Sequence, residues 1–168
     1  MVVQKFIQEI AQGPLPRVLF VHGPEIMWQD QIYQALKERN AKDSLGEFNW
    51  SVSYGQKEFD LESLLLELGM VPWGSEARIV VVKNADQIPA ALMDKLVSWL
   101  DKHPDANCLA LFFDKVDNRL KYVKALRQLA KEIECTPLQG DGLVRHVVDL
   151  CTEQGKKMKR DVAEAFLA

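Results

Sequence analysis

The chain has 168 residues, of which 48% are hydrophobic and 27% are charged, and its formal net charge is −3. This composition is typical of a soluble protein with one full domain and the start of another, and the negative charge argues against broad, charge-driven nucleic-acid binding. Its three cysteines lack metal-binding spacing, no apolar run reaches membrane-spanning length, and the N-terminus is no secretion signal, so we expect a cytoplasmic protein.

Five strand-like runs alternate with helical patterns from Arg17 onward. The runs at 17–22, 78–83 and 108–113 are almost continuously apolar, which is typical of strands buried on both faces, and the β-branched run at 78–83 predicts a central strand. Trp50, Val52 and Tyr54 alternate with polar residues, which predicts a half-buried strand. The five predicted strands are residues 17–22, 49–55, 78–83, 108–113 and 132–135.

Helical periodicity fills the segments between these runs. Asp60 is a favourable N-cap and Gly69 a favourable C-terminal stop for one leucine-rich helix, and Pro89 is expected in the first turn of another. The predicted helices are 1–13, 28–39, 60–69, the segment after Pro89, 120–130, 143–151 and the segment from Asp161. Strands interleaved with helices predict an α/β fold, with a five-stranded, mainly parallel sheet covered by helices on both faces.

The pattern changes after the fifth strand, where only helices follow. We therefore expect a domain boundary near residue 140, with an α/β core at 1–140 and a helical segment at 141–168. No stop signal ends the last helix before Ala168, which predicts that the chain is a fragment.

The stretch "LFVHGPEIMWQD" (residues 19–30) is a strand that runs into a glycine and then a helix, as in a phosphate-binding loop. That loop reads G-x-x-x-x-G-K-[ST], in which the glycines let backbone amides surround phosphates, the lysine neutralises them and the hydroxyl binds magnesium. Counting from Gly23, these positions hold Trp28, Gln29 and Asp30. We therefore expect a degenerate loop without a bound cofactor.

A second position needed for ATP hydrolysis also differs. A magnesium-binding Asp is expected at the end of a later strand, but residues 78–83 end in Lys83, and Asp86 has the wrong offset. Asp114 and Asp117 after the next strand are interpreted as solvated turn residues. The three histidines are too scattered for a metal cluster, and His22 is interpreted as a hydrogen-bonded polar residue. We predict neither a catalytic residue nor a metal site.

Gly69 and Gly74 enclose the apolar turn Met70, Val71, Pro72 and Trp73. The spacing alone fits two structures. Trp73 either packs back into the core of its own domain, or projects from a loop as an anchor for a partner. An aromatic side chain flanked by smaller apolar residues is how a small interface concentrates its binding energy.

Four segments resemble one family. They are "LFVHGPEIMWQD", "LESLLLELGMVPWGSEARIVVVKNADQI", "CLALFFDKVDNRLKYVKAL" and "IECTPLQGDGLVRHVVDL". In this order and spacing they resemble the delta subunit of the bacterial DNA polymerase III clamp loader. The resemblance implies an AAA+ protein that has lost ATP hydrolysis, with an ATPase-like core at 1–140 and the first part of a helical lid at 141–168. The family's third domain, a helical collar, is expected to be absent.

The resemblance also implies a function in DNA replication. The family binds the ring-shaped sliding clamp (the beta subunit) and favours its opening for loading onto primed DNA, within the DNA polymerase III holoenzyme, a nucleotidyltransferase. Its clamp-binding turn corresponds to Met70, Val71, Pro72 and Trp73. The family often has Leu-Phe or Phe-Phe where this chain has Pro72-Trp73, so the aromatic position is kept. The implied partners are the clamp, other loader subunits and primer-template DNA.

Two alternatives remain open at this stage. Besides the clamp-loader function, the chain could be a divergent nucleotide-binding enzyme with an unrecognised phosphate site, or an inactive AAA+ scaffold of another complex. Two groups of basic residues are interpreted chiefly as solvated helix faces, with contacts to DNA phosphates inside a loader as the alternative. The groups are Lys115, Arg119, Lys121, Lys124, Arg127 and Lys131, and Lys156, Lys157, Lys159 and Arg160.

Overall fold

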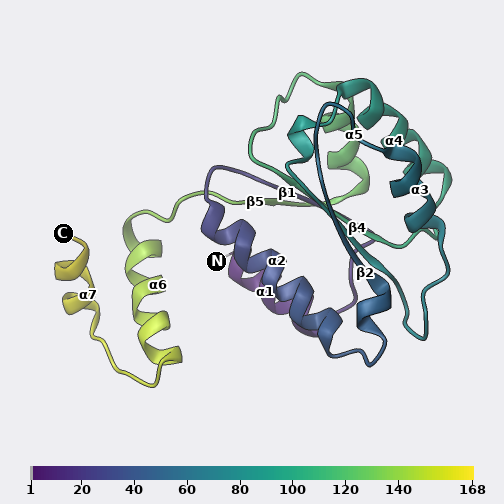
Figure 1. Cartoon of the computed structure of the whole chain (residues 1–168). Helices are drawn as coiled ribbons and strands as arrows, with labels where there is room; N and C mark the ends of the chain where they lie inside the picture. The colour runs from purple at the N-terminus through teal and green to yellow at the C-terminus, as the bar shows by residue number, and fades with distance from the viewer. Residues whose placement is uncertain (1) are drawn as a thin grey trace. The chain divides into compact units, whose positions relative to one another are not determined.

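The computed structural model describes residues 2–168, and its main feature is one sheet of five parallel strands (Figure 1). The strands are β1 (Val18–His22), β2 (Trp50–Tyr54), β3 (Ile79–Lys83), β4 (Cys108–Phe113) and β5 (Lys131–Glu134). Their order is β2-β3-β4-β1-β5, and each neighbouring pair is parallel. The predicted α/β fold is confirmed. β3 has a neighbour on each side, although β4 is the middle strand.

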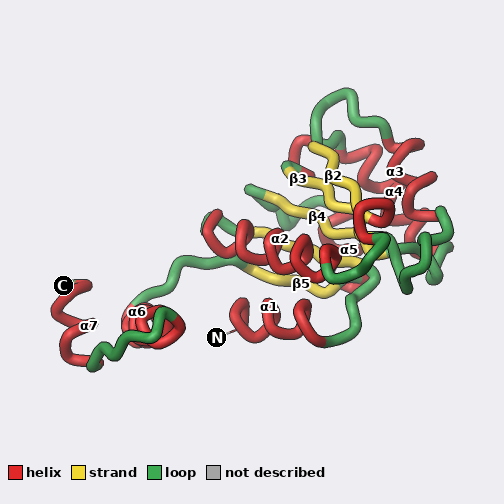
Figure 2. The backbone as a smooth tube through the Cα atoms, turned by 60° about the horizontal axis from the view of Figure 1, so that its bottom comes forward, coloured by secondary structure: helices red, strands yellow, loops and turns green. Residues whose placement is uncertain are grey.

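Helices cover both faces of this sheet, as Figure 2 shows. One face carries α1 (Val2–Gln12) and α2 (Ile26–Ala41). The other carries α3 (Leu61–Gly69), α4 (Ala90–Lys102) and α5 (Lys121–Leu129). Two short 3-10 helices, η1 (Gly46–Asn49) and η2 (Ala85–Gln87), precede β2 and follow β3.

The interior strands β1, β3 and β4 are buried, except for Lys83 at the end of β3, because helices cover both of their faces. Every residue of β1 and β4 is buried, as the continuous apolar runs predicted. Val18 and Phe20 of β1 belong to the core formed with α3, α4 and α5. Successive strand residues point to opposite faces, so the buried Leu19 and Val21 face α1 and α2.

Several local predictions can be compared with the structure. Asp60 caps α3 as predicted, and its carboxylate accepts a hydrogen bond from the Ser63 N–H over 3.1 Å. Tyr54 is 57% exposed instead of half-buried, because it ends an edge strand that pairs with β3 alone. Pro89 is the residue before α4 instead of lying in its first turn. Cys108 and Cys135 are free, buried thiols, in agreement with their interpretation as small apolar residues.

Residues 2–135 and residues 136–168 form two separate compact units. The first is the α/β unit, and it ends slightly ahead of the boundary expected at residue 140. The second contains α6 (Gly140–Glu153) and α7 (Arg160–Leu167), and His146 and Ala163 are buried. Within residues 2–168, no helix combines the length and hydrophobicity that a membrane-spanning segment needs.

Candidate functional site

The turn that follows α3 exposes its apolar side chains to solvent. Trp73 is 64% exposed, Val71 83% and Met70 47%, and Pro72 is half-buried. Large apolar side chains are normally placed inside, so several exposed together on one short turn indicate an interaction surface. The alternative in which Trp73 packs into the core of its own domain is therefore wrong.

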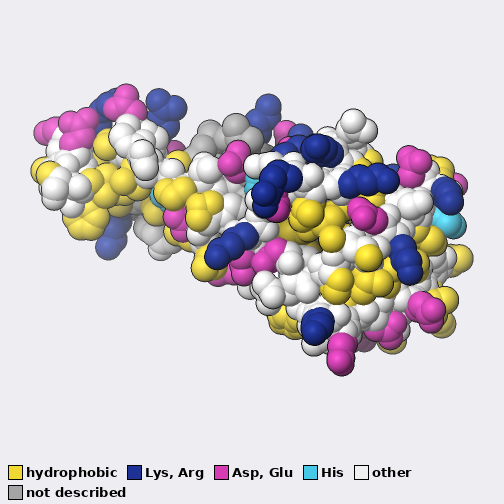
Figure 3. Space-filling model, turned by 90° about the horizontal axis from the view of Figure 1, so that it is seen from above, with side chains coloured by type: hydrophobic (Ala, Val, Ile, Leu, Met, Phe, Trp, Pro, Cys, Tyr) yellow, Lys and Arg dark blue, Asp and Glu magenta, His cyan; other side chains and the backbone are white. Residues whose placement is uncertain are grey.

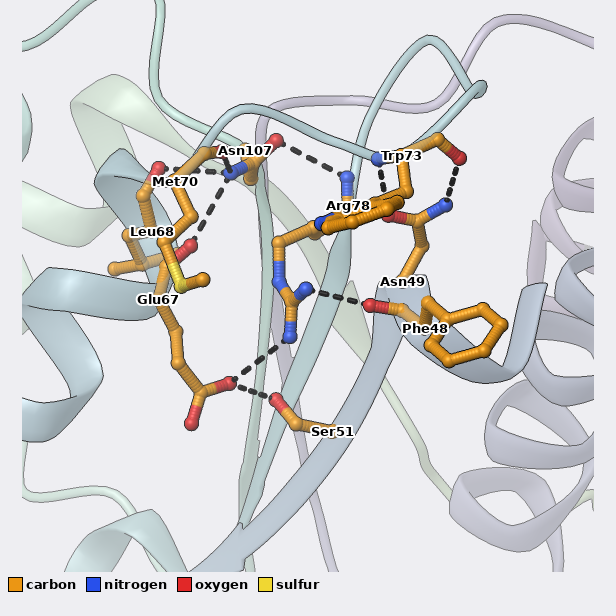
Figure 4. A network of polar contacts seen from close by, with 9 residues as sticks. All are labelled: Phe48, Asn49, Ser51, Glu67, Leu68, Met70, Trp73, Arg78 and Asn107. Atoms are coloured by element: carbon orange, nitrogen blue, oxygen red, sulfur yellow. Dashed lines mark hydrogen bonds and ion pairs between the residues drawn. The ribbon is translucent and has the colours of Figure 1, made fainter. Parts of the chain in front are cut away.

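Asn107 fixes both ends of the connection between α3 and β3, which contains this turn, as Figure 4 shows. Its side-chain amide donates hydrogen bonds to the main-chain carbonyls of Met70 over 2.6 Å, Leu68 over 3.0 Å and Glu67 over 3.2 Å. Its side-chain oxygen accepts a hydrogen bond from the Arg78 N–H over 3.0 Å. Asn107 is buried, so its side chain supplies carbonyls at the end of α3 with a donor where water has little access.

Asn49 contacts the same connection at Trp73, between its two ends. Its side-chain oxygen accepts a hydrogen bond from the Trp73 N–H over 2.8 Å, and its amide donates one to the Trp73 carbonyl, also over 2.8 Å. The same amide lies 3.4 Å from the carbonyl oxygen of Leu45. Asn49 is fully buried. One side chain therefore satisfies both polar main-chain groups of the residue that carries the exposed indole.

A second segment places another aromatic side chain beside Trp73. The ring centroids of Phe48, in η1, and Trp73 lie 6.3 Å apart with the planes tilted by 33°, and Phe48 is 54% exposed. Gly74 follows with φ +62°, and a Cβ there would lie 2.8 Å from Cδ1 of Leu45, so both the backbone conformation and the space favour glycine. We call Leu45, Phe48, Met70, Val71 and Trp73 the apolar turn surface.

Arg78 links the two segments that form this surface. Its guanidinium donates to the Phe48 carbonyl over 2.6 Å and lies 3.8 Å from the carboxylate of Glu67, which also accepts a hydrogen bond from the Ser51 hydroxyl (Figure 4). η1, the end of α3 and the start of β3 are therefore joined by polar contacts. These contacts hold the backbone that carries the exposed side chains in one conformation.

The position expected for a phosphate loop has a different structure. β1 ends at His22 and α2 begins at Ile26, so only a short connection lies between them. Gly23 has φ +125°, and a Cβ there would lie 2.3 Å from the carbonyl oxygen of Cys135. That same oxygen accepts a hydrogen bond from the Glu25 N–H over 3.1 Å. The connection therefore packs against the residue after β5 and makes no wide loop around a phosphate.

The residues at the lysine and second-glycine positions of the phosphate-loop motif are buried and have structural roles. Gln29 is buried, and its side-chain amide donates to the carbonyls of Gly23 and Phe113, each over 2.9 Å. Trp28 is fully buried, whereas Asp30 is exposed. The amide of Gln29 joins α2 to Gly23, after β1, and to Phe113 at the end of β4, and the indole of Trp28 is part of the buried core.

The end of β3 has a cation where an ATPase needs a magnesium ligand. The ammonium of Lys83 lies 3.7 Å from the centre of the Tyr33 ring, a cation–π contact. Asp86 accepts a hydrogen bond from the Asp114 N–H over 3.1 Å. Among the described residues, no group of His, Cys, Asp and Glu has the arrangement of a metal site. A small cavity nearby is lined by Ile26, Gln29, Asp30, Tyr33, Lys83, Asn84, Phe112 and Asp114.

Acidic residues neutralise several of the basic side chains. Arg119 pairs with Asp117 over 3.0 Å, and this hydrogen bond lowers the pKa of that carboxyl to about 2. His22 lies 2.8 Å from Glu132, which also accepts a hydrogen bond from Arg127 over 3.1 Å, so His22 has the partner that was predicted. On the face in Figure 3, Lys and Arg side chains stand among acidic and hydrophobic ones and form no continuous basic surface.

The apolar turn surface lies at the amino ends of the strands, whereas the phosphate-loop position lies at their carboxyl ends. Asn49, Arg78 and Asn107 are the residues directly before β2, β3 and β4, which are neighbours in the sheet. Gly23 instead follows the carboxyl end of β1. The sequence pointed to residues 70–73, and their role in binding stays a prediction. It did not mark Phe48, Asn49 or Asn107 as neighbours of this turn.

Comparisons with known proteins identify one family and one fold. The sequence profile of the family described as "DNA polymerase III, delta subunit" matches residues 24–136. No curated protein sequence matches the chain significantly.

Solved structures of similar fold include three bacterial proteins. The DNA clamp loader delta protein YqeN of Bacillus subtilis has a TM-score of 0.77 at 19% identity, covering 97% of this chain and 51% of that one. A DNA polymerase III gamma subunit-related protein of Thermotoga maritima has a TM-score of 0.56 at 14% identity (90% and 52%). The RuvB Holliday junction branch migration motor of Thermotoga maritima has 0.54 at 15% (97% and 54%). The fold is that of AAA+ proteins, and the chain spans about half the length of these relatives.

Proposed function

The chain belongs to the family of DNA polymerase III delta subunits, and from this we propose that it is a clamp-loader subunit that binds the sliding clamp through the turn Met70, Val71, Pro72 and Trp73. It would act in DNA replication in the cytoplasm, with other loader subunits and primer-template DNA as further partners. Residues 141–168 would form the first part of the lid.

The exposure of Trp73 on a fixed turn is the observation that carries this proposal. An indole that is 64% exposed in the free chain has most of its surface left to bury in a partner. Complete burial of such a side chain contributes about 2–4 kcal/mol at about 25 cal/mol per Å². The hydrogen bonds from Asn49 and Asn107 order the turn before it binds, which reduces the entropy lost on association.

Opening of the clamp requires more than binding. A partner shifts a closed ring toward its open form only if it binds the open form more tightly. A shift from 1:99 to 99:1 needs a preference of about 5.5 kcal/mol. In the proposed function, the turn supplies the contact, and opening further requires that the chain bind the open ring more tightly than the closed one.

The proposal includes no ATP hydrolysis by this chain. A working phosphate loop needs a lysine and a wide ring of backbone amides around the phosphates. Here Gln29 is engaged with two carbonyls, Trp28 is buried in the core, and Lys83 stands in place of a magnesium ligand. Energy for loading would come from other subunits of the loader.

The test measures binding of the purified chain to a purified bacterial sliding clamp by surface plasmon resonance. We expect a Kd in the micromolar range or below, and Trp73→Ala should weaken binding by at least about 30-fold. Tyr54→Ala is the matched control, because Tyr54 is an aromatic residue 57% exposed at the far end of β2. No binding of the intact chain, or equal loss in both variants, would overturn the proposal.

A further inference from the structure

Trp73 is fixed by a side chain from a segment that lies elsewhere in the sequence. The Asn49 carboxamide forms hydrogen bonds of 2.8 Å with both the N–H and the carbonyl of Trp73. Two such bonds to one residue resemble the exchange between paired strands and define the orientation of both adjoining peptide planes. The direction of the Trp73 side chain follows from that of its backbone.

Asn49 restrains the connection between α3 and β3 at a point between its two ends. Asn107 fixes the turn at Met70 and at Arg78, so the residues between are attached at their ends. Asn49 contacts the main chain of Trp73 between those two points. Because Asn49 is fully buried, water does not compete for its amide, and the restraint is stronger than an exposed hydrogen bond would be.

The same residue also sets the place of the neighbouring aromatic ring. Phe48 directly precedes Asn49 in η1, and its ring centroid lies 6.3 Å from that of Trp73. The main chain of Asn49 carries Phe48 while its side chain holds Trp73. The two exposed rings therefore have a fixed mutual geometry that depends on one residue.

We propose that Asn49 is a positioning residue for clamp binding, which fixes Trp73 beside Phe48 before the partner arrives. This inference rests on the proposed function of the turn. Without the Asn49 side chain, the turn would remain attached by Asn107 but would sample other orientations of Trp73, and association would have to select one of them. Affinity for the clamp should fall, although no contact with the clamp is removed.

A double-mutant cycle tests the inference on the full chain. Asn49→Ala should weaken clamp binding by about five- to tenfold, as expected for the ordering of one large side chain and its turn. Combined with Trp73→Ala, it should cause no further loss beyond about twofold, because Asn49 acts through Trp73. If Trp73→Ala itself has no effect, the proposed function fails. If Trp73→Ala weakens binding and Asn49→Ala does not, only the present inference fails.

Asn40→Ala is the matched control. The Asn40 amide donates to the Gly46 carbonyl over 2.8 Å, so it holds the start of η1, and among the described hydrogen bonds it makes none to residues 70–73. We expect its affinity for the clamp to stay within about twofold of the parent chain. Equal losses in Asn40→Ala and Asn49→Ala would show that loosening of η1 suffices, and would overturn the role of Asn49.

Fluorine NMR of chains labelled with 5-fluorotryptophan supplies an independent readout. In Asn49→Ala, the resonance of Trp73 should shift or broaden, while those of Trp28 and Trp99 stay in place and report an intact core. If Asn49→Ala does not fold, Asn49→Ser is measured in the same way, because its hydroxyl is too short to bridge both groups. An unchanged Trp73 resonance in a folded variant would contradict the proposal.

Discussion

Gln29 donates a hydrogen bond from its side-chain amide to the main-chain carbonyl of Phe113 over 2.9 Å, which joins α2 to the end of β4. The same amide donates to the carbonyl of Gly23 over an equal distance. Gln29 stands at the position of the lysine in a phosphate loop, counted from Gly23. The position that binds phosphate in ATPases therefore holds a residue that stabilises the fold in this chain.

Replacement of Gln29 by alanine should destabilise the fold. Two carbonyls at the ends of β1 and β4 would lose their buried donor, and an unsatisfied buried group costs about 1–3 kcal/mol. Urea unfolding measures the change. Gln34→Ala, at an exposed position of the same helix, is the control and should change the free energy of unfolding by less than about 0.5 kcal/mol. Equal stabilities of the two variants would contradict the role of Gln29.

Gln29→Lys should not restore ATP binding, although it reintroduces the lysine of the motif. Trp28 would still fill the core where the loop needs a glycine, and Glu25 would still donate to Cys135. Isothermal titration with ATP and magnesium should show no heat of binding for the parent chain or the variant at millimolar nucleotide. Saturable binding and turnover by the parent chain would instead support a nucleotide-dependent enzyme.

Asn107→Ala should loosen the base of the turn and lower the stability of the α/β unit. The variant leaves the carbonyl of Met70 and the N–H of Arg78 without their side-chain partner, whereas the carbonyl of Leu68 keeps the main-chain N–H of residue 107. We expect a loss of about 1–3 kcal/mol in the free energy of unfolding. Asn118→Ala removes one exposed hydrogen bond to Arg127 and should cost less than about 0.5 kcal/mol. Urea titration of both variants makes the comparison, and a loss as large in Asn118→Ala would count against the anchoring role.

The sequence predicted the sheet well because its interior strands are buried on both faces. In a chain of this composition, a short and continuous apolar run such as residues 108–113 is typical of a strand that helices cover on both sides. The interpretation of Tyr54 was wrong because alternation alone does not reveal that a strand lies at the edge of a sheet and ends there. That information resides in the strand order, which depends on contacts between distant segments.

The surroundings of the candidate site could not be predicted, for a related reason. Two glycines enclosing an apolar turn, together with the family resemblance, pointed to residues 70–73, but nothing local marks Asn49, Phe48 or Asn107 as their neighbours. These residues meet the turn because β2, β3 and β4 are adjacent and parallel, so the segments that precede them lie together at the amino ends of the strands. Asparagine directly before a strand is the one signal available, and it acquires meaning only with the strand order.

Thiol reactivity should separate the three cysteines. Burial raises the pKa of the Cys108 thiol from 9.0 to about 12, and burial also raises that of Cys135 to about 12, whereas Cys151 is half-buried. The thiolate is the reactive form, so at pH 8 the reagent DTNB should modify Cys151 quickly and the other two only on unfolding. A reaction of all three thiols at one rate in the folded chain would contradict this.

The same pKa shifts imply a loss of stability at alkaline pH. Between pH 9 and 12 the unfolded chain releases the protons of Cys108 and Cys135 while the folded chain keeps them, so the unfolded state binds fewer protons. The free energy of unfolding must then fall as pH rises through this range. Urea unfolding at pH 8 and pH 10 measures the slope, which should be smaller in Cys108→Ala than in the parent chain.

Phe48→Ala should weaken clamp binding without unfolding the chain. The ring is 54% exposed and lies 6.3 Å from Trp73, so it offers the partner a second aromatic face and contributes little to the core. We expect affinity to fall by about three- to tenfold, and the free energy of unfolding to change by less than about 0.5 kcal/mol. Surface plasmon resonance and urea titration measure the two effects on the same preparations.

Tyr54→Ala again provides the comparison, because Tyr54 is exposed to nearly the same extent and ends the strand that Phe48 shortly precedes. If clamp binding is a general response to exposed aromatic side chains, the two variants should lose affinity equally. If the apolar turn surface is the binding site, only Phe48→Ala should lose it, since Phe48 is the one that lies beside Trp73. Retention of full affinity by Phe48→Ala, with loss in Trp73→Ala, would confine the site to the turn after α3.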